Sequence, residues 1–151
     1  MIMKKIVVLA VLCMCSLATA GEVKFLFGDD YVEADLELAR SGQLSAGVLG
    51  AIDFTTVQGQ LLKNFQVDIG DNYVGLFVKV DLREGPVVPY LAYKPMIRNT
   101  TLNKVFHVLE AGVDAEITKT FGVGAAVQWC RQLGSRQYDD VRFLVTAPIK
   151  F

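Results

Sequence analysis

The sequence predicts an all-β fold, an eight-stranded antiparallel up-and-down transmembrane β-barrel. Three observations support this class. Apolar residues recur at every second position along most of the chain, which is the period of a β-strand. The alternating segments are typically about 10 to 13 residues long, which suits a strand that crosses a bilayer better than the usual soluble strand of about 5 to 6. Short stretches rich in turn residues separate them, and this indicates an antiparallel meander.

Residues 1–20 are predicted to form a cleaved signal peptide, which leaves residues 21–151 as one barrel domain. Lys4 and Lys5 form a positive start, an apolar run begins at Ile6, and Ala18-Thr19-Ala20 resembles a cleavage site. The apolar run is shorter than the roughly 20 residues of a membrane helix. An uncleaved helix is the first alternative. A lipoprotein signal is the second, although Met14 precedes Cys15 where such a signal has a small residue.

The composition of the mature chain excludes several classes of protein. Cleavage removes two of the 15 Lys and Arg and none of the 16 Asp and Glu, so the formal net charge becomes −3 (13 − 16) and nucleic-acid binding is not expected. Only Cys130 survives of the three cysteines, which excludes an internal disulfide framework. Because His107 is the only histidine, no metal site or cofactor is expected.

The first four expected strands lie in the first half of the mature chain. In "VEADLEL" (32–38) apolar residues alternate with two Glu and one Asp. "QLSAGVLGAIDF" (43–54) places Leu, Ala, Val, Gly, Ile and Phe on one face. "VQGQLLKNFQVD" (57–68) alternates with Gln and Asn, although Lys63 breaks the rule, and "YVGLFVKVDL" (73–82) sets Val and Leu opposite Lys79 and Asp81. Each segment has one apolar face, as a strand in the wall of a barrel requires.

The last four expected strands alternate more strongly. In residues 87–98 the apolar face lies opposite Lys94 and Arg98, and in 105–117 it lies opposite Glu110, Asp114 and Glu116. In 121–129 it lies opposite Gly, Ala and Gln. The strand 141–151 ends the chain with apolar residues at every odd position.

The leading "VKFLF" (23–27) is out of phase with the segment that follows it. Its apolar residues are odd-numbered, whereas those after Gly28 are even-numbered. A bulge at Gly28 would produce this one-residue shift. A separate ninth strand would place the two termini on opposite sides of a membrane. We therefore expect one bulged or broken first strand, with a separate segment at residues 22–30 as the alternative.

The apolar face is expected to contact lipid and the mixed face to line the interior. The expected interior charges are Glu33, Asp35, Glu37, Lys79, Asp81, Lys94, Arg98, Glu110, Asp114, Glu116, Arg142 and Lys150. Eight strands enclose just enough room for their own side chains, so these charges are predicted to fill the interior as salt bridges. We expect the acidic residues of the first strand to face Arg142 and Lys150 across the closing seam. A narrow polar conduit is the alternative.

The terminal "FLVTAPIKF" carries a resemblance to a known class. With the signal peptide and the amphipathic strands, it resembles the small bacterial outer-membrane β-barrels of the OmpX-like and OmpA-transmembrane type; the acidic start and "GVGAAVQW" are faintly similar to the YfaZ family. In that class the last strand typically ends on Phe after alternating apolar residues, as a signal for the insertion machinery. The matching positions here are Phe143, Val145, Ala147, Ile149 and Phe151. Pro148 departs from the pattern because it has no N–H to donate.

The resemblance implies that the protein lies in the bacterial outer membrane. Its expected partners are outer-membrane lipid, lipopolysaccharide and the insertion machinery, and the protein is expected to be a monomer. We expect a structural or envelope-integrity role without catalysis. The predicted outer loops of about four to eight residues are short for a receptor or adhesin surface. A channel for small polar solutes and a soluble, lipocalin-like periplasmic barrel are the alternatives.

A lipid A-modifying enzyme is a weaker alternative. The lipid A deacylases among small barrels have a serine two residues after their histidine, whereas His107 is followed there by Leu109. His107 is therefore expected to be an interfacial residue. Tyr73, Tyr93, Phe121 and Trp129 are expected in aromatic girdles near the strand ends, and Cys130 is expected to be a buried, inert thiol.

Overall fold

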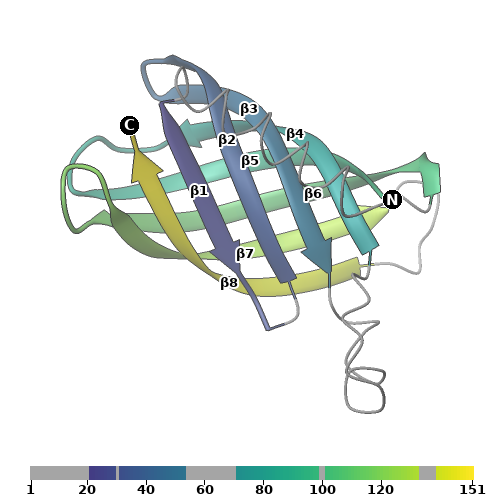
Figure 1. The fold of residues 1–151 in the computed structure, drawn as a ribbon. Helices are drawn as coiled ribbons and strands as arrows, with labels where there is room; N and C mark the ends of the chain where they lie inside the picture. Colours follow the sequence, from purple (N-terminus) through teal and green to yellow (C-terminus); the bar gives the residue numbers. More distant parts are fainter. Residues whose placement is uncertain (1–20, 30, 54–70, 99–100, 133–138) are drawn as a thin grey trace.

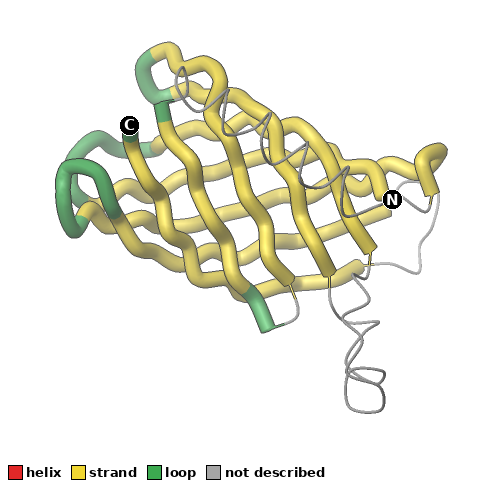
Figure 2. The backbone as a smooth tube through the Cα atoms, viewed as in Figure 1, coloured by secondary structure: helices red, strands yellow, loops and turns green. Residues whose placement is uncertain are grey.

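The computed structural model describes residues 21–29, 31–53, 71–98, 101–132 and 139–151, and its regular elements are β-strands (Figure 2). The strands, in chain order, are Glu22–Phe27 (β1), Tyr31–Ser41 (β2), Leu44–Asp53 (β3), Asp71–Asp81 (β4), Val87–Arg98 (β5), Thr101–Glu116 (β6), Gly122–Gln132 (β7) and Asp139–Lys150 (β8). In these described ranges no helix has the length and apolarity needed to cross a membrane.

The eight strands form a closed barrel in which each strand pairs antiparallel with its neighbour in sequence. The ring closes where β1 pairs with β8, from Glu22 opposite Lys150 to Phe27 opposite Val145. Figure 1 shows the strands winding around the wall, with β1 and β8 side by side. Closure removes the unpaired sheet edges, so the backbone polar groups are satisfied within the wall. The expected eight-stranded up-and-down barrel is confirmed.

The prediction of one bulged first strand is wrong, because residues 22–27 form a strand of their own. The chain reverses after β1, where the Gly28 N–H donates to the Tyr31 carbonyl (2.8 Å). In the resulting hairpin Phe27 lies opposite Val32, so every odd-numbered residue of β1 faces an even-numbered residue of β2. This register shifts the apolar parity by one residue without a bulge.

The count of eight strands is right, but the set of strands differs from the expected one. The expected strand 57–68 lies outside the described residues. The ring is complete without it, because β3 pairs directly with β4, from Leu44 opposite Val80 to Asp53 opposite Asp71. The eighth strand of the ring is β1, whereas the prediction had counted residues 57–68 among the eight.

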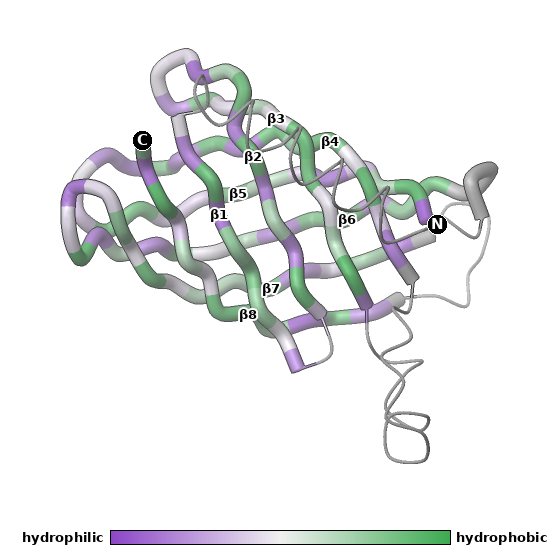
Figure 3. The backbone as a smooth tube through the Cα atoms, in the orientation of Figure 1, coloured by the Kyte–Doolittle hydropathy of each residue, from purple (hydrophilic) through white to green (hydrophobic). Residues whose placement is uncertain are grey.

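Along most strands apolar residues alternate with more polar ones (Figure 3). The exposed apolar side chains give the barrel wall an apolar outer face. Outward side chains are widely exposed, with Leu76 at 60% and Phe143 at 77%. The inward face carries buried charges such as Glu33 and Lys94. A lipocalin-like barrel would have the reverse arrangement, because a soluble protein cannot present a continuous apolar belt to water. That alternative is therefore wrong.

The two ends of the barrel differ in their connections. At one end, which we call the turn end, lie the short turns 42–43, 82–86 and 117–121, together with Gly21 and Phe151. Gly42 adopts a φ of 59° in the tightest of these turns, a conformation that favours glycine. The opposite loop end has connections at 28–30, 54–70, 99–100 and 133–138. Residues 54–70, which separate β3 from β4, lie outside the described residues.

Prolines interrupt the backbone ladder on two sides. The β4–β5 register breaks between Gly75–Met96 and Val78–Tyr93, where Pro95 faces Leu76 and has no N–H to donate. The β7–β8 register breaks between Thr146 and Ile149, around Pro148.

Pro148 has no N–H to donate and lies in the strand that closes the ring, but its nitrogen faces β7. The Lys150 N–H donates to the Thr120 carbonyl (2.8 Å) on the β7 side, and alternate residues of a strand direct their N–H groups to the same side. The β1–β8 seam is uninterrupted as a result.

Candidate functional site in the barrel interior

Lys94 projects inward from β5 to the centre of a group of buried polar side chains. Its Nζ forms ion pairs with Glu33, with Asp35 Oδ2 (2.6 Å) and with Glu110 Oε2 (2.7 Å). The Lys94 side chain is 1% exposed and that of Glu33 is 0% exposed. The three contacts match the three donors of an ammonium group. One cation therefore faces three carboxylates, from β2 and β6, in a site closed to bulk solvent.

Neutral donors supply further hydrogen bonds to these carboxylates. Gln128 Nε2 donates to Glu110 Oε2 (2.6 Å) and to Glu33 Oε2 (3.1 Å). The Tyr90 hydroxyl donates to Glu110 Oε1 (2.9 Å), and the Tyr31 hydroxyl donates to Glu33. An unpaired buried charge costs several kcal/mol, so these donors are needed to hold three carboxylates around one lysine. We call Lys94, Glu33, Asp35, Glu110 and Gln128 the central cluster.

An apolar cluster packs inside the barrel beside the central cluster. Several of its residues lie where the strands approach the loop end, among them Tyr73 opposite Arg98. Its members are Leu26, Tyr31, Leu49, Ala51, Tyr73, Phe77, Tyr90, Ala92, Met96, Phe106, Val108, Ala126, Cys130 and Leu144. The interior is thus filled by the central cluster and by apolar side chains together, whereas salt bridges alone were predicted.

A second charged group lies nearer the turn end. Lys24 of β1 reaches across the interior to form an ion pair with Asp114 of β6. The same Nζ lies 3.6 Å from the centre of the Tyr90 ring, within range of a cation–π interaction. Thr146 donates its hydroxyl hydrogen to Asp114. Tyr90 therefore contacts both groups, by its hydroxyl on one side and its ring face on the other.

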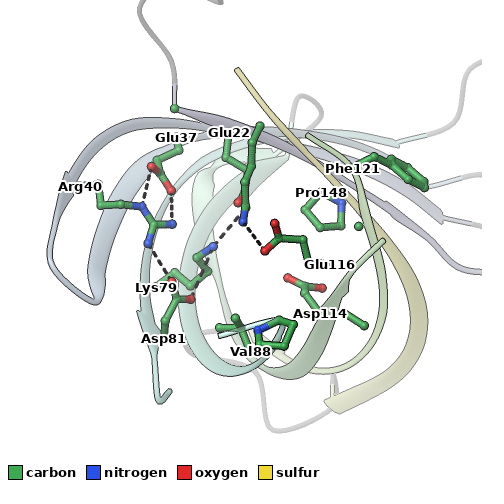
Figure 4. A pocket seen from close by; sticks show the side chains of 15 residues that line it. Glu22, Glu37, Arg40, Lys79, Asp81, Val88, Asp114, Glu116, Phe121 and Pro148 are labelled. Carbon is green, nitrogen blue, oxygen red and sulfur yellow. Dashed lines mark hydrogen bonds and ion pairs between the residues drawn. The ribbon is translucent and has the colours of Figure 1, made fainter. Parts of the chain in front are cut away.

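The turn end opens into a cavity of about 370 Å³, which we call the vestibule (Figure 4). Arg40 holds the Glu37 carboxylate through two hydrogen bonds (2.9 and 2.7 Å) and also pairs with Asp81 (2.8 Å). Lys79 pairs with Glu22 (3.2 Å) and more distantly with Asp81 (3.7 Å). Two-point contact between guanidinium and carboxylate fixes the geometry of the rim.

Arg142 organises a smaller group toward the loop end. It pairs with Asp53 (3.1 Å) and with Asp140 (3.0 Å), and its guanidinium lies 4.3 Å from the centre of the Tyr31 ring. Tyr31 links this group to the central cluster through Glu33.

The predicted pairing across the closing seam is wrong. Glu33 and Asp35 pair with Lys94, whereas Arg142 pairs with Asp53 and Asp140. Lys150 lies 3.4 Å from Glu116 at the exposed rim. The physical reason is that β1 lies between β2 and β8, so the acidic ladder of β2 is not next to the last strand.

The remaining predicted interior charges are divided among the groups described above. Glu37, Lys79 and Asp81 meet at the vestibule. Arg98 lies near the loop end, with its guanidinium 5.5 Å from the centre of the Phe106 ring.

Several interior residues were not predicted from the sequence. Glu22 and Lys24 share the even parity of Leu26 in "EVKFLF", which is a signal for an inward face once β1 is taken as a strand. Asp53 has the inward parity of its own strand in the same way. Gln128 shares the inward parity of its strand, but that parity did not mark it as a partner of the buried charges. Arg40 has the outward parity of β2 and gave no such signal, because a register shift between Glu37 and Ala39 precedes it and its partner Asp81 lies in a distant strand.

The outward face carries a paired histidine and tyrosine. His107 Nδ1 is hydrogen-bonded to the Tyr93 hydroxyl, and the two rings stack with centroids 5.8 Å apart. Trp129 and Phe121 are also outward and partly exposed, but Tyr73 is not part of a girdle. It faces inward and makes an edge contact with Phe106 (5.6 Å), so its predicted position is wrong.

The terminal strand presents its odd-numbered residues outward, opposite β1 and β7. Phe143, Val145 and Phe151 are widely exposed, and the Phe151 N–H donates to the Gly21 carbonyl (3.2 Å). Ala147 and Ile149 pair with Phe25 and Val23 of β1. Cys130 is a free, buried thiol on the inward face.

The described residues contain no cluster of His, Cys, Asp and Glu arranged to hold a metal ion. No protein-family model matches the sequence, and no curated protein matches it either.

Similar solved structures do exist. One is a de novo designed protein, TMB2.3, solved by NMR in solution: the TM-score is 0.62 at 8% identity, over 88% of this chain and 94% of that one. Another is the crystal structure of Neisserial surface protein A, with a TM-score of 0.54 at 12% identity, over 87% of this chain and 93% of that one. Neither supports the faint likeness to the YfaZ family. The chain has the fold of the small eight-stranded transmembrane β-barrels, as its sequence predicted.

Proposed function

We propose that the protein is a bacterial outer-membrane β-barrel with a structural or envelope-integrity role and a largely closed interior. The observation that carries the proposal is the filled midsection of the barrel. The central cluster includes Lys94 at 1% and Glu33 at 0% side-chain exposure, and apolar side chains pack against it. A wall that is apolar outside and sealed inside suits a protein that stabilises a membrane rather than one that conducts through it.

The proposal includes a route to the membrane. The signal peptide over residues 1–20 directs export and is removed, and the insertion machinery recognises the outward stripe of β8 that ends at Phe151. Outer-membrane lipid and lipopolysaccharide then surround the apolar belt, and the barrel acts as a monomer. Figure 1 and the β1–β8 register support this route, since Phe151 adjoins the closing seam and is exposed.

The membrane assignment is tested by gel migration and fractionation. The protein in a membrane fraction is expected to migrate faster before boiling than after it, because a closed barrel resists unfolding by detergent. Release into the soluble periplasmic fraction would overturn the assignment. Phe151→Ala is expected to reduce the amount assembled in cells, while the purified variant still folds in detergent. Equal assembly of both forms would remove the role of Phe151 as a signal.

The envelope role is tested by deleting the gene and measuring uptake of a hydrophobic dye. Uptake is expected to rise in the deletion strain and to return to normal when the wild-type chain is restored. Restoring a chain that lacks residues 141–151, and so cannot close the barrel, serves as the control and should not rescue. Unchanged permeability in the deletion strain would contradict an envelope role.

A narrow channel is the second candidate, since the vestibule is a cavity at the turn end that charged side chains line. Planar-bilayer recording separates the two functions. The sealed midsection predicts no discrete openings from the purified protein, whereas regular single-channel steps would favour conduction.

Lipid A modification is tested by His107→Ala. His107 bonds to Tyr93 on the outward face, and unchanged lipid A turnover would exclude it as a catalytic base.

A further inference from the structure

Asp35 differs from the other two carboxyl groups of the central cluster in its hydrogen bonds. Glu33 and Glu110 each accept hydrogen bonds from two neutral side chains as well as contacting Lys94. Among the described donors, Lys94 alone contacts Asp35, at its Oδ2 atom (2.6 Å), and Asp35 Oδ1 is buried without a hydrogen-bond partner. A buried, ionised oxygen that no donor satisfies costs free energy. Asp35 is therefore the carboxyl group of the cluster that its neighbours stabilise least as an anion.

The carboxyl group of Asp35 also lies against that of Glu33. The two residues are two positions apart on β2, they face inward together, and the same Lys94 Nζ contacts both. Their carboxyl groups are in hydrogen-bonding contact with each other. Two carboxylates have no hydrogen to donate, so such a contact requires a proton on one of them. Repulsion favours the same result, because two carboxylates that share one site do not both ionise readily.

The groups packed around Asp35 leave it with one cation in contact. Lys24 of β1 lies opposite Asp35 in the β1–β2 register, but its ammonium pairs with Asp114. With all three carboxyl groups ionised, the group around Lys94 would carry a net charge of −2 (1 − 3), and a proton on Asp35 reduces this to −1 (1 − 2). The titratable groups around Asp35 are Glu33 on its own strand, Lys24 on β1, Tyr90 and Lys94 on β5, and Glu110 and Asp114 on β6. The neighbouring side chains of β3, β7 and β8 are uncharged, namely Leu49, Gln128 and Thr146.

We propose that the central cluster is a proton-binding site, with one proton held on Asp35 and donated in a hydrogen bond to Glu33. The site goes beyond the envelope role and does not depend on it. The proton comes from solvent when the barrel folds, and apart from the O–H bond on Asp35 no covalent bond forms or breaks. Asp35 then donates to Glu33 and accepts from Lys94. A neutral carboxyl group also carries less charge on the oxygen that has no donor.

The bound proton couples the stability of the barrel to pH. An aspartate in the unfolded chain has a pKa of about 3.9 and is ionised at neutral pH, so folding takes up one proton at Asp35. The stabilisation from this site is complete below about pH 4, and it declines as the pH rises, by about tenfold in the folding equilibrium constant per pH unit, until the folded barrel releases the proton. Through this site the strands hold together more tightly in mildly acidic than in alkaline solution.

The test compares the wild-type chain with Asp35→Asn by urea unfolding in lipid vesicles at several pH values. Unfolding is followed by fluorescence of the single tryptophan, Trp129. Asparagine keeps the shape of a protonated aspartate and donates to Glu33 at every pH. The ratio of the wild-type folding equilibrium constant to that of Asp35→Asn is expected to fall about tenfold per pH unit from about pH 5 to about pH 7.

Asp53→Asn is the matched control, because Asp53 is also a buried aspartate but pairs with Arg142 (3.1 Å). An aspartate that is ionised in both the folded and the unfolded chain adds no pH dependence. The ratio of wild type to Asp53→Asn is therefore expected to stay within about twofold over the same pH range. A ratio for Asp35→Asn that is as constant as that for Asp53→Asn would overturn the proposal.

Infrared spectroscopy of the wild-type barrel decides the question if Asp35→Asn does not fold. At neutral pH the spectrum is expected to contain the carbonyl stretch of a protonated carboxyl group, which shifts in heavy water. The band should also shift when the chain contains ¹³C-labelled aspartate, which distinguishes Asp35 from Glu33. A spectrum with carboxylate bands alone would overturn the proposal.

Discussion

Replacing Lys94 by methionine is expected to destabilise the barrel more than any other single loss of charge described above. Methionine keeps an unbranched stem of similar length, so little cavity forms. The change removes the ammonium that contacts Glu33, Asp35 and Glu110 and leaves three carboxylates facing one another without a cation. Removing one partner of a buried ion pair typically costs about 3 to 5 kcal/mol. A total stability of about 5 to 15 kcal/mol means that this loss is a large fraction of the whole.

Lys150→Met provides the matched control. The Lys150 side chain is 48% exposed and lies 3.4 Å from Glu116, so the same chemical change removes an ion pair that water already screens. Exposed pairs contribute about 0.2 to 1 kcal/mol. The two lysine-to-methionine changes should therefore differ several-fold in their effect on stability.

The assay is urea unfolding in lipid vesicles, followed by Trp129 fluorescence and by gel migration without boiling. A second chain carries Lys94→Met with Glu33→Gln, Asp35→Asn and Glu110→Gln, and it should recover most of the loss, because a neutral buried cluster no longer needs a cation. The reasoning is refuted if Lys94→Met loses no more stability than Lys150→Met. It is also refuted if the fourfold variant is no more stable than the single one.

Three further predictions follow from packing, backbone bonding and burial. Gly112→Ala should cost about 1 to 3 kcal/mol, since a Cβ there would lie 2.5 Å from Tyr90 Cζ, and the same change should cost less when it is made in a Tyr90→Leu chain; an unshifted urea midpoint would contradict this packing. Pro95→Ala should add a backbone bond to the Leu76 carbonyl and up to about 1 kcal/mol, visible as an amide protected from hydrogen exchange, whereas a freely exchanging amide would contradict it. Cys130, at 2% exposure, should react with a maleimide only after unfolding, and rapid labelling of the folded barrel would show that the interior is open.

The faces of the barrel could be predicted from the sequence because alternation is a local property. In β2, for example, the even-numbered Val32 and Ala34 face outward and the odd-numbered Glu33 and Asp35 face inward, as their order in the chain indicates. Because successive side chains of a strand point to opposite faces, only one orientation places the apolar residues toward the outside and the polar residues toward the interior.

The first strand could not be predicted in the same way. A one-residue shift of parity results from a bulge within one strand and also from a tight hairpin between two strands. Only the pairing of β1 with both β2 and β8 distinguishes these cases. This error led to a second one. Because β1 and β2 were taken as one strand, residues 57–68 were needed to reach a count of eight strands.

The partners of the interior charges were beyond prediction for a related reason. Parity places Lys94 and Glu110 on the inward face, but the height at which each lies depends on the register of every strand between them. Lys94 meets Glu33 from across the barrel, 61 positions away in the chain. No local pattern encodes that distance, and the same holds for the contact of Gln128 with Glu110.

The positions of the two proline interruptions affect how easily neighbouring strands of the barrel separate and pair again. Pro95 and Pro148 remove backbone bonds from β4–β5 and from β7–β8, and in both cases the paired strands are consecutive in the chain. A covalent connection keeps the strands of a hairpin at high local concentration, so a missing bond there is readily compensated when the pair re-forms. The β1–β8 seam joins the two ends of the domain and has no such tether, yet its register from Glu22 to Phe27 is continuous. The bonding deficit thus falls where the chain itself resists separation.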